Sequence, residues 1–205
     1  MANTYAPFGF RQVKGTGSVP TFEQSVRTID KDNTTAIFFG DAVIPLTTGY
    51  IAQATASTVR MEGIFVGCKY LSTSQKRTVW SNYWPGSDAS EDVEAYVIDD
   101  PNAQFIVQSS DGGVAGGTDP VTFANIGEYI NIYVGTGDTA TGVSGMTVDV
   151  NTLNTTATLP FRIVGLVQNP PGANGTDIAS EYNHVIVAFN NASTRTNGAG
   201  PTGIA

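Results

Sequence analysis

Apolar residues along this chain recur mostly at every second position, in short runs that turn-forming residues interrupt. A period of two is typical of half-buried β-strands, whose side chains point alternately to the two faces of a sheet. Glycine, proline, asparagine and aspartate separate the runs, as expected for turns. The pattern predicts strands at residues 22–29, 36–39, 42–46, 58–71, 78–83, 93–98, 103–108, 128–134, 146–150, 158–167 and 182–189.

The longest run, residues 58–71, slips in its alternation at Gly63, which predicts a β-bulge there. Residues 93–98 and 103–108 flank the turn-forming residues 99–102 and are predicted to form a hairpin. No window of the chain has a clear helical period of 3.6 residues. The expected fold class is therefore all-β, a jelly-roll-like β-sandwich or barrel with an extended N-terminal arm.

The two ends of the chain differ from its strand-forming centre. Residues 1–20 carry aromatic side chains in a sequence rich in glycine and proline, which predicts an N-terminal arm. Its aromatic residues either fold back on their own domain or dock on another subunit, and both possibilities remain open. Residues 21–190 are expected to form a single β domain with a loop-rich insertion at 110–160. Residues 191–205 are expected to form a flexible C-terminal tail.

Composition supports a β fold and argues against several functions. Glycine contributes 23 and threonine 26 of the 205 residues, which suits turns and strands better than long helices. Lys and Arg number 10 against 18 Asp and Glu, so the net charge is −8, and binding to nucleic acid or an anionic membrane is not expected. Neither a signal peptide nor a bilayer-spanning apolar run is visible, so the protein is expected to be soluble and made in the cytoplasm.

Candidate nucleophiles and metal ligands are few. One cysteine, Cys68, and one histidine, His184, argue against a zinc site built from such residues and against an internal disulfide. Both lie in apolar strand-like runs, where a packed thiol and a structural histidine are the simpler interpretations. A serine elbow requires glycine two residues after the serine, but Met146 stands at that position after Ser144, which is interpreted as a turn residue. We therefore expect no catalytic residue, no metal and no cofactor, and the chain is not expected to be an enzyme.

The acidic residues form short clusters without a catalytic pattern. Asp99 and Asp100 lie in the predicted turn, where carboxylates commonly accept hydrogen bonds from backbone amides. The cluster at residues 88–94 is interpreted as a solvated loop. Residues 30–41 begin like a calcium-binding loop, but the sixth position is not glycine, and the twelfth is Asp41 rather than glutamate.

Trp80, Tyr83 and Trp84 form the most prominent aromatic group in the sequence. Three interpretations remain open for it: burial in the core, an anchor at a protein interface, or a platform on which sugar rings stack. In the first interpretation Trp80 belongs to the core, and residues 84–86 pack a corner.

Several stretches resemble a family of tailed-bacteriophage capsid cement (decoration) proteins. They are Ala6-Pro7-Phe8-Gly9-Phe10-Arg11, Gly40-Asp41, Gly49-Tyr50, Gly63-Ile64-Phe65-Val66-Gly67-Cys68-Lys69-Tyr70, Trp80-Ser81-Asn82-Tyr83-Trp84-Pro85-Gly86, residues 95–105 and Arg162-Ile163-Val164-Gly165-Leu166. The resemblance extends over most of residues 6–168, and none of these stretches is a catalytic motif.

The resemblance implies a jelly-roll-like protein that binds the outer surface of an expanded phage capsid and clamps neighbouring capsomers. The implied partners are the phage major capsid protein and further copies of this chain, in a homodimer or homotrimer on the virion surface. The residues expected to contact the capsid or another subunit are Phe8, Phe10, Arg11, Tyr83 and Trp84. Lys69, Lys76 and Arg77 either pair with an acidic shell surface or are solvated.

Two other functions remain open. The chain could be another structural protein of a phage head, although a major capsid protein of the common tailed-phage fold needs a long spine helix, which the sequence does not predict. A carbohydrate-binding β-sandwich module is the second alternative, and it would use Trp80 and Trp84 as its sugar platform.

Overall fold

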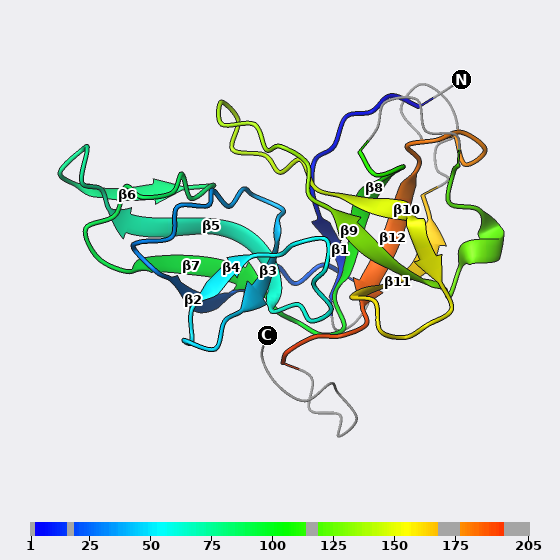
Figure 1. Cartoon of the computed structure of the whole chain (residues 1–205), viewed down its shortest axis with the longest axis horizontal. Coiled ribbons are helices and arrows are strands. Elements are labelled where there is room, and N and C mark those ends of the chain that lie inside the picture. Colours follow the sequence, from blue (N-terminus) through cyan, green and yellow to red (C-terminus); the bar gives the residue numbers. More distant parts are fainter. Residues whose placement is uncertain (1–2, 16–18, 114–118, 168–176, 195–205) are drawn as a thin grey trace.

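The computed structural model describes residues 3–15, 19–113, 119–167 and 177–194. Within these ranges the regular structure is β-strand, apart from one short 3₁₀ turn at Phe123–Asn125. The twelve strands form two six-stranded sheets, which lie at opposite ends of the long axis of the molecule (Figure 1). The predicted all-β fold class is confirmed. No helix in the described part of the chain is long and apolar enough to cross a membrane.

The first sheet closes into a barrel. In spatial order its strands are β1 (Arg11–Lys14), β8 (Gln104–Ser110), β10 (Thr147–Asn154), β9 (Tyr129–Tyr133), β11 (Phe161–Leu166) and β12 (His184–Phe189). Strand β12 also pairs with β8, so five strands close on themselves and β1 is added beside β8. All these pairs are antiparallel except that of β8 with β10. Closure protects backbone groups that an open sheet would leave unpaired at its edges.

The second sheet is inserted in the sequence between β1 and β8, and we call it the inserted sheet. In spatial order its main path is β2 (Ser25–Ile29), β7 (Val93–Ile98), β5 (Gly63–Leu71), β3 (Ala42–Pro45) and β4 (Ile51–Gln53). Strand β6 (Thr78–Ser81) pairs with the second half of β5. The predicted bulge in the longest strand lies further along than Gly63, because the register of β5 with β7 shifts between Phe65 and Gly67.

Aromatic rings fill the interior of the barrel. Phe10 is 2% exposed and stacks on Phe161, with ring centroids 4.7 Å apart. Phe189 contacts the rings of both Phe105 and Phe161. The same apolar cluster continues to the near end of the inserted sheet, where it includes Met61. The barrel and the inserted sheet therefore share a packed junction.

The inserted sheet buries one of its faces under a separate apolar cluster. Strand β7 turns Val93, Ala95 and Val97 toward this face, and all three are completely buried. Trp84 covers them from a segment that follows β6, and its backbone pairs with that of Ile37 through two hydrogen bonds of 2.7 and 2.9 Å. The alternation in β7 thus leaves the opposite face of the sheet to solvent.

The N-terminal segment folds back on its own barrel. Strand β1 pairs with β8, and the side chain of Asn3 both donates to and accepts from the backbone of Asp177. The intervening Gly9 has a φ of +69°, and a Cβ there would lie 2.6 Å from that of Ser144. Of the two possibilities that the sequence left open, residues 3–15 adopt the fold-back one. Residues 1–2 and 16–18 of the expected arm lie outside the described part.

The predicted hairpin of residues 93–98 and 103–108 is wrong, although both strands and the turn exist. The Ala103 amide donates to the Asp100 carbonyl oxygen (3.0 Å), but the flanking strands β7 and β8 belong to different sheets. Turn residues fix only the local change of chain direction. Strand partners are chosen by the apolar faces: β7 pairs with β2 and β5, while β8 pairs with β12 in the barrel.

The division of the chain also differs from the expected one. Residues 110–160 are not a separate insertion, because β9 and β10 are barrel strands. It is the sheet from β2 to β7 that interrupts the barrel sequence. Residues 191–194 of the expected tail are held against the junction, where Ala192 forms a bridge with Met61. The remaining residues of that tail, 195–205, and residues 114–118 lie outside the described part.

Candidate functional site

The outer face of the inserted sheet carries a group of neighbouring side chains that we call the aromatic face. It consists of Val26 on β2, Lys69 on β5, Trp80 on β6, and Glu94 and Tyr96 on β7. Strand register brings them together, because Lys69 is paired with both Trp80 and Glu94, and Tyr96 is paired with Val26. Residues paired directly across antiparallel strands point to the same side of a sheet.

Trp80 is the most exposed aromatic side chain of this face, with 67% of its surface accessible. Its ring stacks on that of Tyr96, at a centroid distance of 5.8 Å and an interplanar angle of 5°. Gly67 of β5 is paired with Tyr96 and places no side chain between the two rings. A Cβ at this glycine would lie 2.9 Å from the Ser81 carbonyl oxygen, so the close approach of β6 depends on it. Val26, 56% exposed, extends the apolar surface beside Tyr96.

Charged groups hold the aromatic rings in place. The Lys69 Nζ atom lies 5.2 Å from the centroid of the Trp80 ring and 3.5 Å from Glu94 Oε2. The Tyr96 hydroxyl donates to Glu94 Oε1 at 2.7 Å, and this bond is the main cause that lowers the pKa of Glu94. Desolvation, together with Glu94, raises the pKa of Tyr96 to about 12. The lowered pKa keeps Glu94 ionised at neutral pH, so the face presents this carboxylate and the Lys69 side chain beside the two aromatic rings.

Phe10 and Trp84, two of the five residues predicted to contact the capsid, are buried. Phe10 lies within the barrel, and Trp84 has no exposed surface in the core of the inserted sheet. The indole Nε1 of Trp84 donates to the Asn33 carbonyl oxygen at 3.2 Å, which satisfies its polar group inside the protein. Their predicted role as surface contacts is wrong, because large aromatic rings gain more from burial in the chain's own cores.

The other three predicted contact residues are partly buried and bound within the chain. Phe8 meets the ring of His184 edge-on, with centroids 5.1 Å apart. The Arg11 guanidinium lies 4.5 Å from the centroid of the Phe39 ring, and Tyr83 stacks on Phe38. These contacts explain why the three residues occupy their positions without a second subunit.

A buried carboxylate links the inserted sheet to the barrel. Asp41 is 1% exposed and accepts hydrogen bonds from the Phe38 amide (2.8 Å), Gln53 Nε2 (2.8 Å) and Ser144 Oγ (2.5 Å). Desolvation raises the pKa of Asp41, while the three donors oppose that rise. Ser144 thus holds a loop of the barrel sequence against this carboxylate, which gives it a structural role.

The remaining chemical candidates also have structural partners. Cys68 is buried in the core of the inserted sheet, and burial raises the pKa of its thiol to about 12. Burial lowers the pKa of His184. In the predicted turn, Asp100 accepts from the Asn102 amide as expected, whereas Asp99 accepts from side chains on β2. In the ranges that the structure describes, no group of three or more His, Cys, Asp or Glu residues is placed to hold a metal ion.

Comparisons of the chain with protein-family models, with curated proteins and with solved structures found no match. The candidate site therefore depends on the geometry of the chain itself.

The aromatic face was only partly foreseeable from the sequence. Trp80 and Trp84 stand four residues apart, so strict alternation would place both on the same side of one strand. Strand β6 ends at Ser81, and the chain then turns so that Trp84 reaches the inner face. The pairing of Trp80 with Lys69 places its ring on the outer face, and this register cannot be read from the sequence.

Proposed function

We propose that the chain is a structural virion protein that binds the outer surface of an expanded phage capsid and stabilises it by clamping neighbouring capsomers. The observation that carries the proposal is the aromatic face. A displayed tryptophan held by stacking and by a cation is typical of the residues that dominate protein interfaces. The resemblance of most of residues 6–168 to cement proteins supports a capsid as the partner.

The overall arrangement suits a clamp. The barrel and the inserted sheet lie at opposite ends of the long axis, so the two bodies can contact different neighbours (Figure 1). Many individually modest contacts on a fixed lattice give strong retention. A protein that binds the assembled shell but not its free subunits stabilises assembly by mass action. Self-association into a dimer or trimer would multiply the contacts further.

The contact residues in this proposal differ from those expected from the sequence. Trp80 replaces Phe10 and Trp84 as the principal anchor, and Val26 extends its apolar surface. Lys69 and Glu94 lie beside Trp80 and are available at the rim of the contact, since their side chains are 37% and 40% exposed. Such a rim orients the partner more than it adds affinity.

Co-sedimentation with purified shells of the same virus, expanded and unexpanded, tests the proposal. We expect saturable binding to expanded shells, and about 30-fold weaker binding for Trp80→Ala, the loss typical of a hot-spot residue of about 2 kcal/mol. Phe123→Ala is the matched control, because Phe123 is an aromatic residue 54% exposed on the barrel side. Absence of binding to either shell form would refute the cement function. If Trp80→Ala binds expanded shells as tightly as the unchanged chain, the aromatic face is not the capsid contact.

Carbohydrate binding is the second candidate, and the planar, exposed ring of Trp80 beside hydrogen-bonding groups is the observation that favours it. Sugar rings stack on such surfaces, while a neighbouring carboxylate and ammonium group bind hydroxyls. Glycan-dependent quenching of fluorescence that Trp80→Ala abolishes, together with an absence of shell binding, would support this alternative instead.

A further inference from the structure

The chain leaves β12 at Phe189 and crosses from the barrel to the inserted sheet. We call residues 190–194 the strap. The Met61 amide donates to the Asn191 carbonyl oxygen (2.9 Å), and the Ser193 amide donates to the Met61 carbonyl oxygen (2.8 Å). Between them Ala192 lies parallel to Met61, which is fully buried two residues before β5 begins. The strap is thus added as an extra extended segment beside the entry to β5.

Side-chain amides fix the first half of the strap to the barrel. Asn190 Nδ2 donates to the carbonyl oxygens of Ala157 and Leu159, each at 2.8 Å. The Asn190 amide donates to the Pro160 carbonyl oxygen at 2.8 Å. Asn191 Nδ2 adds a bond of 3.1 Å to the Thr158 carbonyl oxygen. All these acceptors lie in the connection between β10 and β11, so this end of the strap belongs to the barrel.

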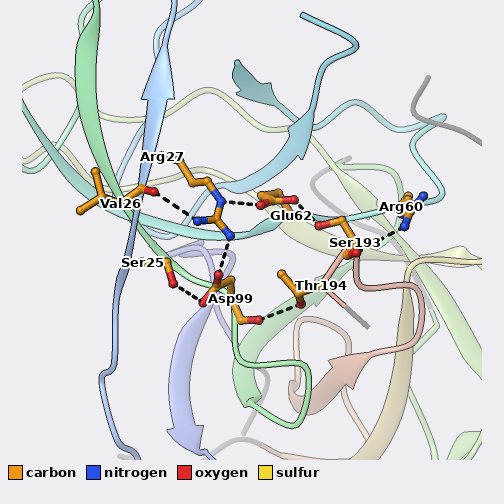
Figure 2. Close-up of polar contacts among 8 residues, drawn as sticks. All are labelled: Ser25, Val26, Arg27, Arg60, Glu62, Asp99, Ser193 and Thr194. Atoms are coloured by element: carbon orange, nitrogen blue, oxygen red, sulfur yellow. Dashed lines mark hydrogen bonds and ion pairs between the residues drawn. The ribbon is translucent and has the colours of Figure 1, made fainter. Parts of the chain in front are cut away.

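The second half of the strap is bound to a charged cluster of the inserted sheet (Figure 2). The Ser193 hydroxyl donates to Glu62, and the Thr194 hydroxyl donates to the Asp99 carbonyl oxygen at 3.1 Å. The Arg27 guanidinium of β2 joins both acidic residues, with its Nε 2.5 Å from Glu62 and its Nη2 2.7 Å from Asp99. Arg27 is partly buried, with 29% of its side-chain surface accessible, and it pairs with two carboxylates that are 10% and 18% exposed. Because two charge-assisted pairs share one guanidinium, the cluster holds the strap more firmly than a single exposed ion pair would.

The charged cluster lies close to the places where the backbone passes between the barrel and the inserted sheet. In strand order the backbone crosses between barrel and inserted sheet twice, after β1 and after β7. Asp99 lies at the second crossing, and Arg27 lies on the strand that follows the first. The strap adds a non-covalent connection to those made by the shared apolar cluster and by the hydrogen bond between Ser144 and Asp41.

We propose that residues 190–194 are a conformational strap that fixes the inserted sheet relative to the barrel, with Arg27, Glu62 and Asp99 as its fastening. When the strap is released, both sheets stay folded and remain joined through the contact of Asp41 with Ser144, but the junction opens locally at Met61 and the two bodies gain freedom to move relative to each other. The inference is independent of capsid binding, because it concerns only contacts within the chain.

Hydrogen–deuterium exchange of the full chain tests the strap. The double variant Ser193→Ala/Thr194→Val removes both fastening hydroxyls at nearly constant volume, and a chain that ends at Thr194 is the control for loss of the residues beyond. We expect the Met61 and Ser193 amides to exchange about tenfold faster in the double variant, because two hydrogen bonds to the anchor are lost. Amides of β9 and β11 should exchange at the rate of the full chain, and the control should behave like the full chain.

A second measurement separates a released strap from general destabilisation. Spin labels at Thr78→Cys on the inserted sheet and Thr156→Cys on the barrel side report the distance between the bodies, since both native residues are exposed. We expect a narrow distance distribution in the full chain and a broadened one in the double variant, with unchanged circular dichroism. An unchanged distribution and unchanged exchange at Met61 would overturn the proposal. So would equal acceleration of exchange in β9 and β11, because the strap would then support the whole fold.

Discussion

The two tryptophans of the chain stand four positions apart, one buried and one exposed. Substituting each in turn shows how much each contributes to the stability of the fold. Trp84 is fully buried, meets the ring of Tyr70 edge-on at 5.1 Å, and uses its indole NH within the protein. Trp80 is 67% exposed and has one aromatic neighbour, Tyr96. Trp84→Ala should therefore damage stability, while Trp80→Ala should leave the fold largely intact.

The expected losses in the free energy of unfolding differ several-fold between the two variants. Replacing a buried tryptophan by alanine costs about 3–5 kcal/mol, because apolar contacts are lost and a cavity remains. Trp84→Ala also leaves the Asn33 carbonyl oxygen without this donor, which places it in the upper part of that range. Trp80→Ala loses a stacking contact worth about 0.5–1.5 kcal/mol. Against a total stability of about 5–15 kcal/mol, the first change is severe and the second is minor.

Urea unfolding followed by far-ultraviolet circular dichroism measures both effects without relying on the fluorophores that are removed. With a slope of about 2 kcal/mol per molar urea, Trp84→Ala should lower the midpoint by about 2 M and Trp80→Ala by less than about 0.8 M. Trp84→Phe is the control that retains most of the buried volume, and its urea midpoint should lie between those of the two alanine variants. Equal midpoints for the two alanine variants, or a larger loss for Trp80→Ala, would refute the assigned environments.

Two further predictions concern buried groups of the inserted sheet. Burial raises the pKa of Cys68 to about 12, so at pH 8 its thiol should react with a disulfide reagent at least about hundredfold more slowly than in urea; equal rates would contradict its burial. Desolvation raises the pKa of Asp41, so the folded state binds its proton more tightly than the unfolded chain. The stability of the wild type relative to Asp41→Asn should therefore rise as the pH falls through the folded pKa and level off below the ordinary value of 3.8, in urea midpoints measured from pH 7 to pH 3. A difference that does not change with pH would contradict this.

Local patterns predicted most of the strands because alternation is a property of each strand alone. Strand β7 and the second half of β5 appear where alternating apolar residues indicate them. Strand β1 was missed, since Arg11–Lys14 contains one apolar residue and its polar side chains give no period of two. Its place is fixed by Phe10, which the barrel core holds at the start of the strand. In that core Phe10 contacts Phe105, which is about 95 residues away in the sequence, and no local sequence pattern predicts such a contact.

The pairing of strands and the exposure of side chains could not be predicted from the sequence either, because both depend on contacts between residues far apart in the chain. The residues after Ile98 favour a turn, but the choice between a hairpin and a crossing depends on which apolar faces meet elsewhere. From residue 191 onward the strap was expected to belong to a flexible tail, and the stretch from Asn190 to Thr194 is mostly polar. Their polar groups are satisfied by backbone carbonyls and by Glu62, which are distant partners that composition does not reveal.

Buried positions make up part of the stretches on which the proposed likeness to cement proteins depends. Within the stretch from Trp80 to Gly86, Trp84 is core, and Gly86 has a φ of +84° with space for no Cβ, since one would lie 2.5 Å from the Thr34 carbonyl oxygen. The packing of the inserted sheet requires the residues at such positions, whichever partner the chain binds. Trp80 is different, because neither core requires it and its ring faces solvent. A functional test therefore discriminates best at Trp80, where a loss of binding does not follow from a loss of structure.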